Sequence, residues 1–161
     1  MADKYVDIDT LKYLLYDVHE LEKLLKRERF VDHDKESLNM FLDSSKDFAD
    51  RELFPYFKEM DENPAFHKDG QVYVHKQVET MMKKGGELGF ISSSFDYEVG
   101  GLQIPLMAST ASSYILDAAN NHLPGYAGLT QGAAELIIHF AKKDLLDKYV
   151  PEMLAGNWGG T

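Results

Sequence analysis

The chain has 161 residues and carries 17 basic against 27 acidic side chains, a formal charge of −10 at neutral pH. This length corresponds to one domain, which buries enough surface to hold a core without cross-links. The absence of cysteine excludes disulfide scaffolds, cysteine nucleophiles, thiolate zinc sites and iron–sulfur clusters. It is also compatible with a reducing, cytoplasmic location.

The net charge and the hydropathy pattern bear on partners. An acidic chain repels phosphate and anionic lipid, so we expect no nucleic-acid partner. No apolar run approaches the length of a membrane span, and the N-terminus has no basic stretch followed by an apolar one. We therefore expect no membrane partner and no secretory signal.

Apolar residues recur at helical spacing through most of the chain. The pattern predicts six helical segments at residues 11–25, 38–57, 74–88, 105–118, 129–140 and 145–153. Short connections place successive helices antiparallel, so the expected fold is all-α, an up-and-down bundle of about six helices. In the fifth segment the apolar face holds Leu129, Ala133, Leu136, Ile137 and Phe140.

Proline and glycine mark the expected breaks. Pro55 lacks a backbone donor and predicts a kink or break inside the second segment. Asn63 precedes a proline and marks a boundary. Gly89 suits the left-handed residue after the third segment, and Gly156 ends the sixth. Pro105 suits the first turn of the fourth segment.

Strand signals are nearly absent. Residues 66–73 are interpreted as a loop with Asp69-Gly70 as its turn. Residues 72–74 and 90–91 are the only strand candidates, and both are too short to build a sheet. Residues 90–101 lack a helical period and predict a long connection.

A search for catalytic patterns finds none. Asp61 and Glu62 are adjacent, so on a helix they point about 100° apart. Glu135 and His139 share one helical face, but no Glu-x-x-His spacing accompanies them, and we predict no metal site. The serines at 92–94 lack a nucleophile elbow and are interpreted as satisfying backbone groups. The glycine-rich run 85–89 ends a helical pattern, which favours close helix packing over a phosphate cradle.

Four short motifs, taken in order, resemble signatures of one family. They are Glu52–Pro55 followed by Met60–Glu62, Glu87–Phe90, Asp96–Leu102 and Lys148–Trp158. Together they are similar to the N-terminal helical domain of the flavin-dependent acyl-CoA dehydrogenases. The resemblance covers residues 34–161, and residues 1–33 look like an added N-terminal helical segment.

The resemblance implies a parent enzyme that performs α,β-dehydrogenation of an acyl-CoA thioester with FAD. It implies that the flavin-binding β-domain and the C-terminal catalytic domain are absent from this chain. We therefore expect no catalytic residue here, no retained FAD and no activity from this fragment alone. The expected partners are the acyl-CoA substrate, electron transfer flavoprotein if the parent is a dehydrogenase and not an oxidase, and further copies in a homo-oligomer.

The resemblance also assigns a substrate-binding wall. Alignment through Lys148 and Tyr149 places Gly128, Leu129, Gly132 and Ala133 at positions that line the acyl pocket. Small residues make room and an apolar residue suits a fatty chain. The other interpretation is that these glycines only allow close helix packing.

A second function class stays open on the sequence alone. The absence of a catalytic constellation and the acidic charge are also compatible with a non-catalytic acidic helical interaction module. A third interpretation is a degenerate dehydrogenase-like protein that keeps the fold and has lost its base.

Overall fold

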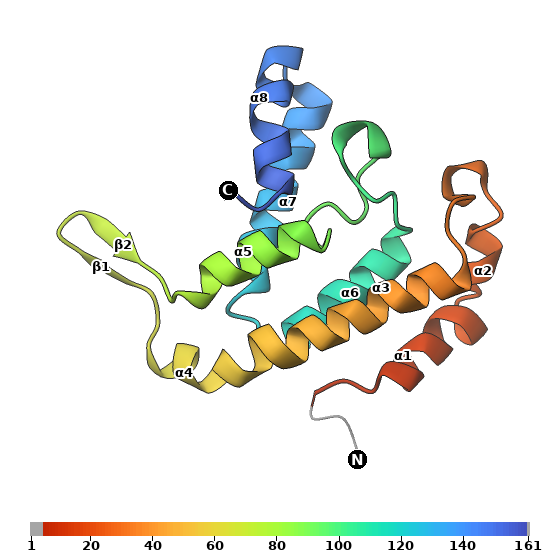
Figure 1. The fold of residues 1–161 in the computed structure, drawn as a ribbon, viewed down its shortest axis with the longest axis horizontal. Helices are drawn as coiled ribbons and strands as arrows, with labels where there is room; N and C mark the ends of the chain where they lie inside the picture. The colour runs from red at the N-terminus through yellow and green to blue at the C-terminus, as the bar shows by residue number, and fades with distance from the viewer. Residues whose placement is uncertain (1–4, 161) are drawn as a thin grey trace.

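The computed structural model describes residues 5–160, and helices dominate it (Figure 1). The all-α fold class is confirmed. Within the described residues, none of the helices is both long and apolar enough to cross a bilayer. The elements in chain order are α1 (Ile8–Tyr13), α2 (Leu21–Leu24), α3 (Lys35–Phe48), α4 (Phe57–Glu62), β1 (Phe66–Lys68), β2 (Gln71–Tyr73), α5 (Gln77–Glu87), α6 (Leu106–Ala119), α7 (Pro124–Phe140) and α8 (Lys143–Leu154).

The first predicted helix is wrong as a single element. Helix α1 runs into a π-helical turn at Leu14–Val18, and α2 starts only after a sharp change of direction. Glu20 causes this change because its backbone is left-handed, with φ of 50°. A left-handed residue cannot continue a right-handed helix. The apolar period continues across the break because both pieces pack on the same core.

The second predicted segment breaks where Pro55 predicts. Helix α3 ends at Phe48, a π-helical turn follows, and Pro55 lies in the first turn of a 3₁₀ helix that leads into α4. The start of α3 is stabilised by a capping box between Asp34 and Ser37, in which each side chain accepts a hydrogen bond from the other residue's backbone N–H. The boundary at Asn63 is confirmed.

Residues 66–73 form a hairpin, so the interpretation of this stretch as a loop is wrong. The turn at Asp69 and Gly70 is confirmed, and both residues have positive φ. Such a turn matches the twist of two antiparallel strands. Phe66 pairs with Tyr73, and their rings stack at 5.1 Å. Both strands are exposed on both faces, which is why no alternation of apolar and polar residues announced them.

Two helix pairs organise the core. Helix α3 lies along α6, and α7 lies along α8, with α5 packed against α7 (Figure 1). Between α3 and α6, Leu42 and Ile115 are fully buried. The hydroxyls of Ser45 and Ser112 meet there at 2.7 Å and satisfy each other inside the core.

Helix α5 approaches the end of α8 through glycine. A Cβ added at Gly86 would lie 2.2 Å from the carbonyl oxygen of Ala155. Gly89 and Gly156 end these helices with φ of 77° and 75°, as the sequence predicts. The glycine-rich run 85–89 therefore serves close packing and helix termination.

Helix α7 buries only part of the face that its periodicity predicts, because Ala133 and Ile137 are half-buried against the core while Leu129, Leu136 and Phe140 are exposed. Its buried positions include Ala127, Thr130 and Ala134. Leu136 is 61% exposed and Phe140 is 81% exposed. The physical reason is that α7 packs mainly on α8 and α5, through a side that carries small residues, and Leu136 and Phe140 lie outside that contact.

Candidate functional site

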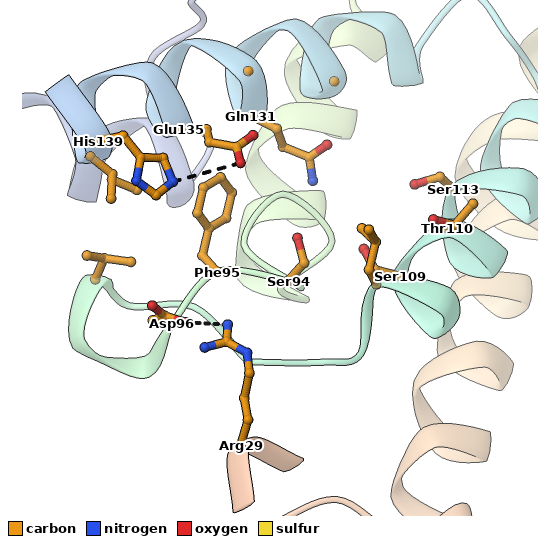
Figure 2. A pocket seen from close by; sticks show the side chains of 15 residues that line it. Arg29, Ser94, Phe95, Asp96, Ser109, Thr110, Ser113, Gln131, Glu135 and His139 are labelled. Atoms are coloured by element: carbon orange, nitrogen blue, oxygen red, sulfur yellow. Dashed lines mark hydrogen bonds and ion pairs between the residues drawn. The ribbon is translucent and has the colours of Figure 1, made fainter. Parts of the chain in front are cut away.

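A cavity of about 490 Å³ lies between α6, α7 and the connection that precedes α6 (Figure 2). Nine of its fifteen lining residues carry a polar or charged side chain. The cavity therefore has a mixed lining, in which polar groups alternate with apolar walls. Its residues are Arg29, Ser94, Phe95, Asp96, Val99, Leu106, Ser109, Thr110, Ser113, Gly128, Gln131, Gly132, Glu135, Ile138 and His139.

Helix α7 supplies one wall at helical spacing. Gly128 and Gly132 stand four residues apart, and beside them Gln131, Glu135 and His139 recur every four residues along the same face. A Cβ added at Gly128 or Gly132 would meet no heavy atom within 4 Å. These two glycines do not serve helix packing within this chain. They leave open space at the cavity wall.

The structure brings together two of the four residues assigned to the acyl pocket. Gly128 and Gly132 line the cavity. Leu129 lies around the helix from them and is 58% exposed. Ala133 is half-buried and packs near Gly160, where an added Cβ would lie 2.9 Å from it. Substrate contact by these four residues stays a prediction.

Gln131 is held in one orientation at the cavity. Its Nε2 donates to the carbonyl oxygens of Phe90, at 3.1 Å, and Ile91, at 2.9 Å. Because the amide nitrogen faces these two acceptors, the amide oxygen is the atom left for the cavity. Figure 2 shows this oxygen turned toward α6.

Helix α6 presents hydroxyl groups to the same space. Ser109 is buried, and its hydroxyl lies 2.7 Å from that of Ser93, which holds the connection against α6. Thr110 and Ser113 are exposed to the cavity, and their hydroxyls have no hydrogen-bond partner among residues 5–160. Two hydroxyls are therefore free to bind another molecule.

The N-terminal segment contributes the opposite side of the cavity. The Arg29 guanidinium pairs with Asp96, and the Arg29 carbonyl accepts from Gln103 Nε2 at 2.6 Å. His33 Nε2 lies 3.0 Å from the carbonyl oxygen of Leu102. These contacts hold residues 96–103 in place. Sequence reasoning missed them because the partners are 67 or more residues apart.

The charges at the cavity do not form a metal site. Glu135 and His139 lie 4.0 Å apart at its upper rim. No group of three or more His, Cys, Asp or Glu side chains that could hold a metal ion occurs in the described part of the chain. Asp96 and Glu135 face the cavity against Arg29 alone as a fixed cation. The rim is acidic when His139 is neutral.

A smaller cavity of about 280 Å³ adjoins the first. It shares Ser113, Gly128 and Gln131 with it and also reaches Asp117. Partial burial raises the pKa of the Asp117 carboxyl. The other lining residues are mostly apolar: Met81, Phe90, Leu116, Pro124, Gly125 and Ala127. The two cavities together run along the seam between α6 and α7.

The family follows from a sequence comparison. The model of the acyl-CoA dehydrogenase N-terminal domain matches residues 35–157, more than half of the chain. The chain belongs to the acyl-CoA dehydrogenase family. The comparison with curated proteins gives no match. Acyl-CoA dehydrogenases are oxidoreductases and generally flavoproteins, and this chain carries their N-terminal helical domain. Arg29 lies before the match, and the role of residues 1–33 as an added segment stays a prediction.

The acyl-CoA dehydrogenase fold raises the question of FAD. The diphosphate of a dinucleotide needs backbone N–H groups that it can approach closely, usually across glycine. The glycine-rich run 85–89 is filled by its own neighbours: Gly86 by Ala155 and Gly89 by Leu102. The glycine-rich run 85–89 therefore forms no cradle for the flavin diphosphate, and no chemical step is assigned to FAD.

One signal in the sequence could have found more of the cavity. The α7 stripe that holds Gln131, Glu135 and His139 has the same helical spacing as its glycines. On α6, Ser109 and Ser113 stand four residues apart. Neither stripe is apolar, so a search for core faces passes over both.

Proposed function

We propose that this chain is the N-terminal domain of an FAD-dependent acyl-CoA dehydrogenase that performs α,β-dehydrogenation of an acyl-CoA thioester. In this role it forms one wall of the acyl and flavin site. The observation that carries the proposal is the cavity along α6 and α7, whose wall is opened by Gly128 and Gly132. The family match supports the reaction class.

Under this proposal, the residues of this chain bind the acyl group and shape the space that it occupies. FAD, held by other domains of the parent, would supply the acceptor for the electrons that leave the acyl group. Neither the base nor the flavin is assigned to the described residues. The helical domain shields the acyl group from water, which strengthens electrostatic interactions at the reacting carbon. Gly128 and Gly132 set how much room the acyl chain has.

The exposed apolar side of α7 supports a larger assembly. Leu129, Leu136 and Phe140 occur on one helix, and exposed apolar patches on soluble proteins usually mark contact surfaces. We propose that other domains of the parent cover this side and hold FAD. We also propose a homo-oligomeric parent in the cytoplasm, with electron transfer flavoprotein as the acceptor if the parent is a dehydrogenase and not an oxidase.

The experiment is a flavin titration of the complete protein that contains this chain. The purified protein is mixed anaerobically with acyl-CoAs of increasing length, and its visible spectrum is recorded. Bleaching of bound flavin by one range of acyl lengths is the expected result. A colourless protein that does not take up FAD would replace this function with the non-catalytic acidic interaction module.

A pair of variants links the activity to the cavity. Gly132→Phe fills the space at the α7 wall and is expected to shorten the preferred acyl chain. Met40→Phe puts the same aromatic side chain at an exposed position of α3, outside the cavity. The control should keep the wild-type length profile. An unchanged profile in Gly132→Phe would remove the acyl chain from this wall.

A further inference from the structure

We infer that this pocket prefers acyl groups that carry a hydroxyl over plain alkyl chains, and that Thr110, Ser113 and Gln131 recognise the hydroxyl. The inference rests on the proposed function, because it names the substrate class of the same pocket. It makes these three side chains specificity-determining residues.

The cavity presents polar atoms that have no partner within the described chain. The hydroxyls of Thr110 and Ser113 have no hydrogen bond within residues 5–160. The Gln131 amide is locked by its two bonds to the connection, so its oxygen is presented as an acceptor. These atoms come from two helices and face one another across the seam (Figure 2). Such convergence of polar groups in a cavity is typical of a binding site.

A plain alkyl chain would bind less favourably than a hydroxylated one, because it leaves these polar groups without partners. An alkyl chain in this pocket displaces water from all three polar groups and offers them nothing. A buried polar group without a partner costs more than the average hydrogen bond contributes. Sites built around a substrate hydroxyl therefore discriminate strongly against the analogue that lacks it. A hydroxyl can donate to Gln131 Oε1 and also accept from Thr110 or Ser113.

The charges on the cavity lining favour a neutral ligand group over an anionic one. Arg29 is the only fixed cation on the lining, and Asp96 already pairs with it. Glu135 adds a second carboxylate at the rim. A ligand carboxylate would meet this acidic lining and the lone pairs of Gln131 Oε1, both of which repel it. The pocket therefore favours a hydroxyl over a terminal acid.

Apolar residues complete the pocket. Phe95, Leu106 and Ile138 line the same cavity and supply contacts for the hydrocarbon part of the ligand. A chain that is apolar along most of its length and hydroxylated near its end fits both parts. The open wall at Gly128 and Gly132 admits it between the two helices.

The test compares three acyl-CoA series with the complete holoenzyme. The series are plain acyl-CoAs, ω-hydroxyacyl-CoAs and ω-carboxyacyl-CoAs of four to sixteen carbons, and the readout is kcat/KM. At the best length the hydroxylated substrate is expected to exceed the plain one by about tenfold, the effect of one or two hydrogen bonds. The carboxylated series should be the poorest. Plain chains that match or exceed hydroxylated ones at every length would overturn the inference.

Variants assign the preference to the residues. The double variant Thr110→Val and Ser113→Ala should lower the hydroxy-to-plain ratio of kcat/KM by about tenfold. Thr110→Ser keeps the hydroxyl and should keep the ratio. Ser44→Ala removes a hydroxyl from α3 outside the cavity and should leave both substrates unchanged. A ratio that survives the double variant would overturn the assignment.

The two proposals fail in different ways. If no acyl-CoA of any series reduces the flavin, the proposed function fails. If plain acyl-CoAs reduce it and hydroxylated ones have no advantage, the function stands and the substrate inference fails. Flavin reduction by any substrate also shows that each variant is folded.

Discussion

Helices α6 and α7 are both rich in apolar residues, yet they differ in how much of their apolar surface is buried. Helix α6 buries Ile115 and Leu116 against the rest of the chain, while α7 leaves Leu136 and Phe140 exposed. The difference lies in their neighbours. Helix α3 runs along α6, whereas α5 and α8 cover only the small-residue side of α7. The apolar content of a helix predicts that one of its faces will be buried, but only the tertiary structure shows which neighbour buries it.

The largest expected effect is a difference in stability between a variant of α6 and a variant of α7. Ile115→Ala removes a fully buried side chain and should lower the free energy of unfolding by about 2–5 kcal/mol. Phe140→Ala removes an exposed one and should change it by less than about 0.5 kcal/mol. Chemical denaturation of this chain measures both. Equal losses would mean that α7 is covered within the chain after all.

Two glycines, one in a packed contact and one at an open wall, should respond to substitution with opposite changes in stability. Gly86→Ala forces a Cβ against the Ala155 carbonyl in the sealed contact between α5 and α8, and overpacking of this kind costs about 1–3 kcal/mol. Gly132→Ala adds a Cβ in open space on α7 and should stabilise the chain by up to about 1 kcal/mol through helix propensity. Thermal and chemical denaturation test the opposite signs. A loss of stability in Gly132→Ala would contradict the open wall.

Two adjacent serines of α6 lie on different sides of the helix, one buried in the core and one at the cavity. Ser112→Ala removes one of the two hydrogen bonds of the buried Ser45 hydroxyl, which keeps its bond to the Phe41 carbonyl, and should cost about 1 kcal/mol. Ser113→Ala faces the cavity and should leave the stability of this chain within about 0.5 kcal/mol of wild type. A double-mutant cycle of Ser45→Ala and Ser112→Ala measures their coupling. Additive losses would show that the two hydroxyls do not interact.

The smallest effect concerns Asp117, at the cavity end of α6. Partial burial raises the pKa of its carboxyl, so the folded state holds the proton more tightly than the unfolded state. The group's contribution to stability is therefore greatest below the unfolded pKa and is lost as pH rises through the folded pKa. Asp117→Asn should be slightly more stable than wild type at neutral pH and equal to it in acid. A pH series of unfolding measurements checks the sign, and a destabilised variant at neutral pH would contradict it.

The candidate site was only half visible in the sequence. Gly128 and Gly132 were found through a family resemblance, and both line the cavity. Arg29 was not found, because its link to Asp96 joins segments 67 residues apart. Gln131 was not found either, since its role comes from two backbone carbonyls that no side-chain pattern announces.

The two errors in the predicted secondary structure have a common physical cause. Glu20 stands in a left-handed conformation that is uncommon for a non-glycine residue, so the break between α1 and α2 had no local signal. The hairpin around Asp69 and Gly70 is exposed on both faces, so its strands show no alternation. In both places the local pattern agreed with more than one structure.

The sequence by itself determined the helical class, the breaks at Pro55, Gly89 and Gly156, and the family through the order of its motifs. These features depend on backbone geometry and on spacing along the chain, which are local. Only the tertiary structure decided that α7 turns its small residues inward, that Arg29 reaches Asp96, and that polar groups of α6 and α7 face one cavity. Periodicity reports which residues share a face, but the free energy that buries a face depends on the neighbour that covers it.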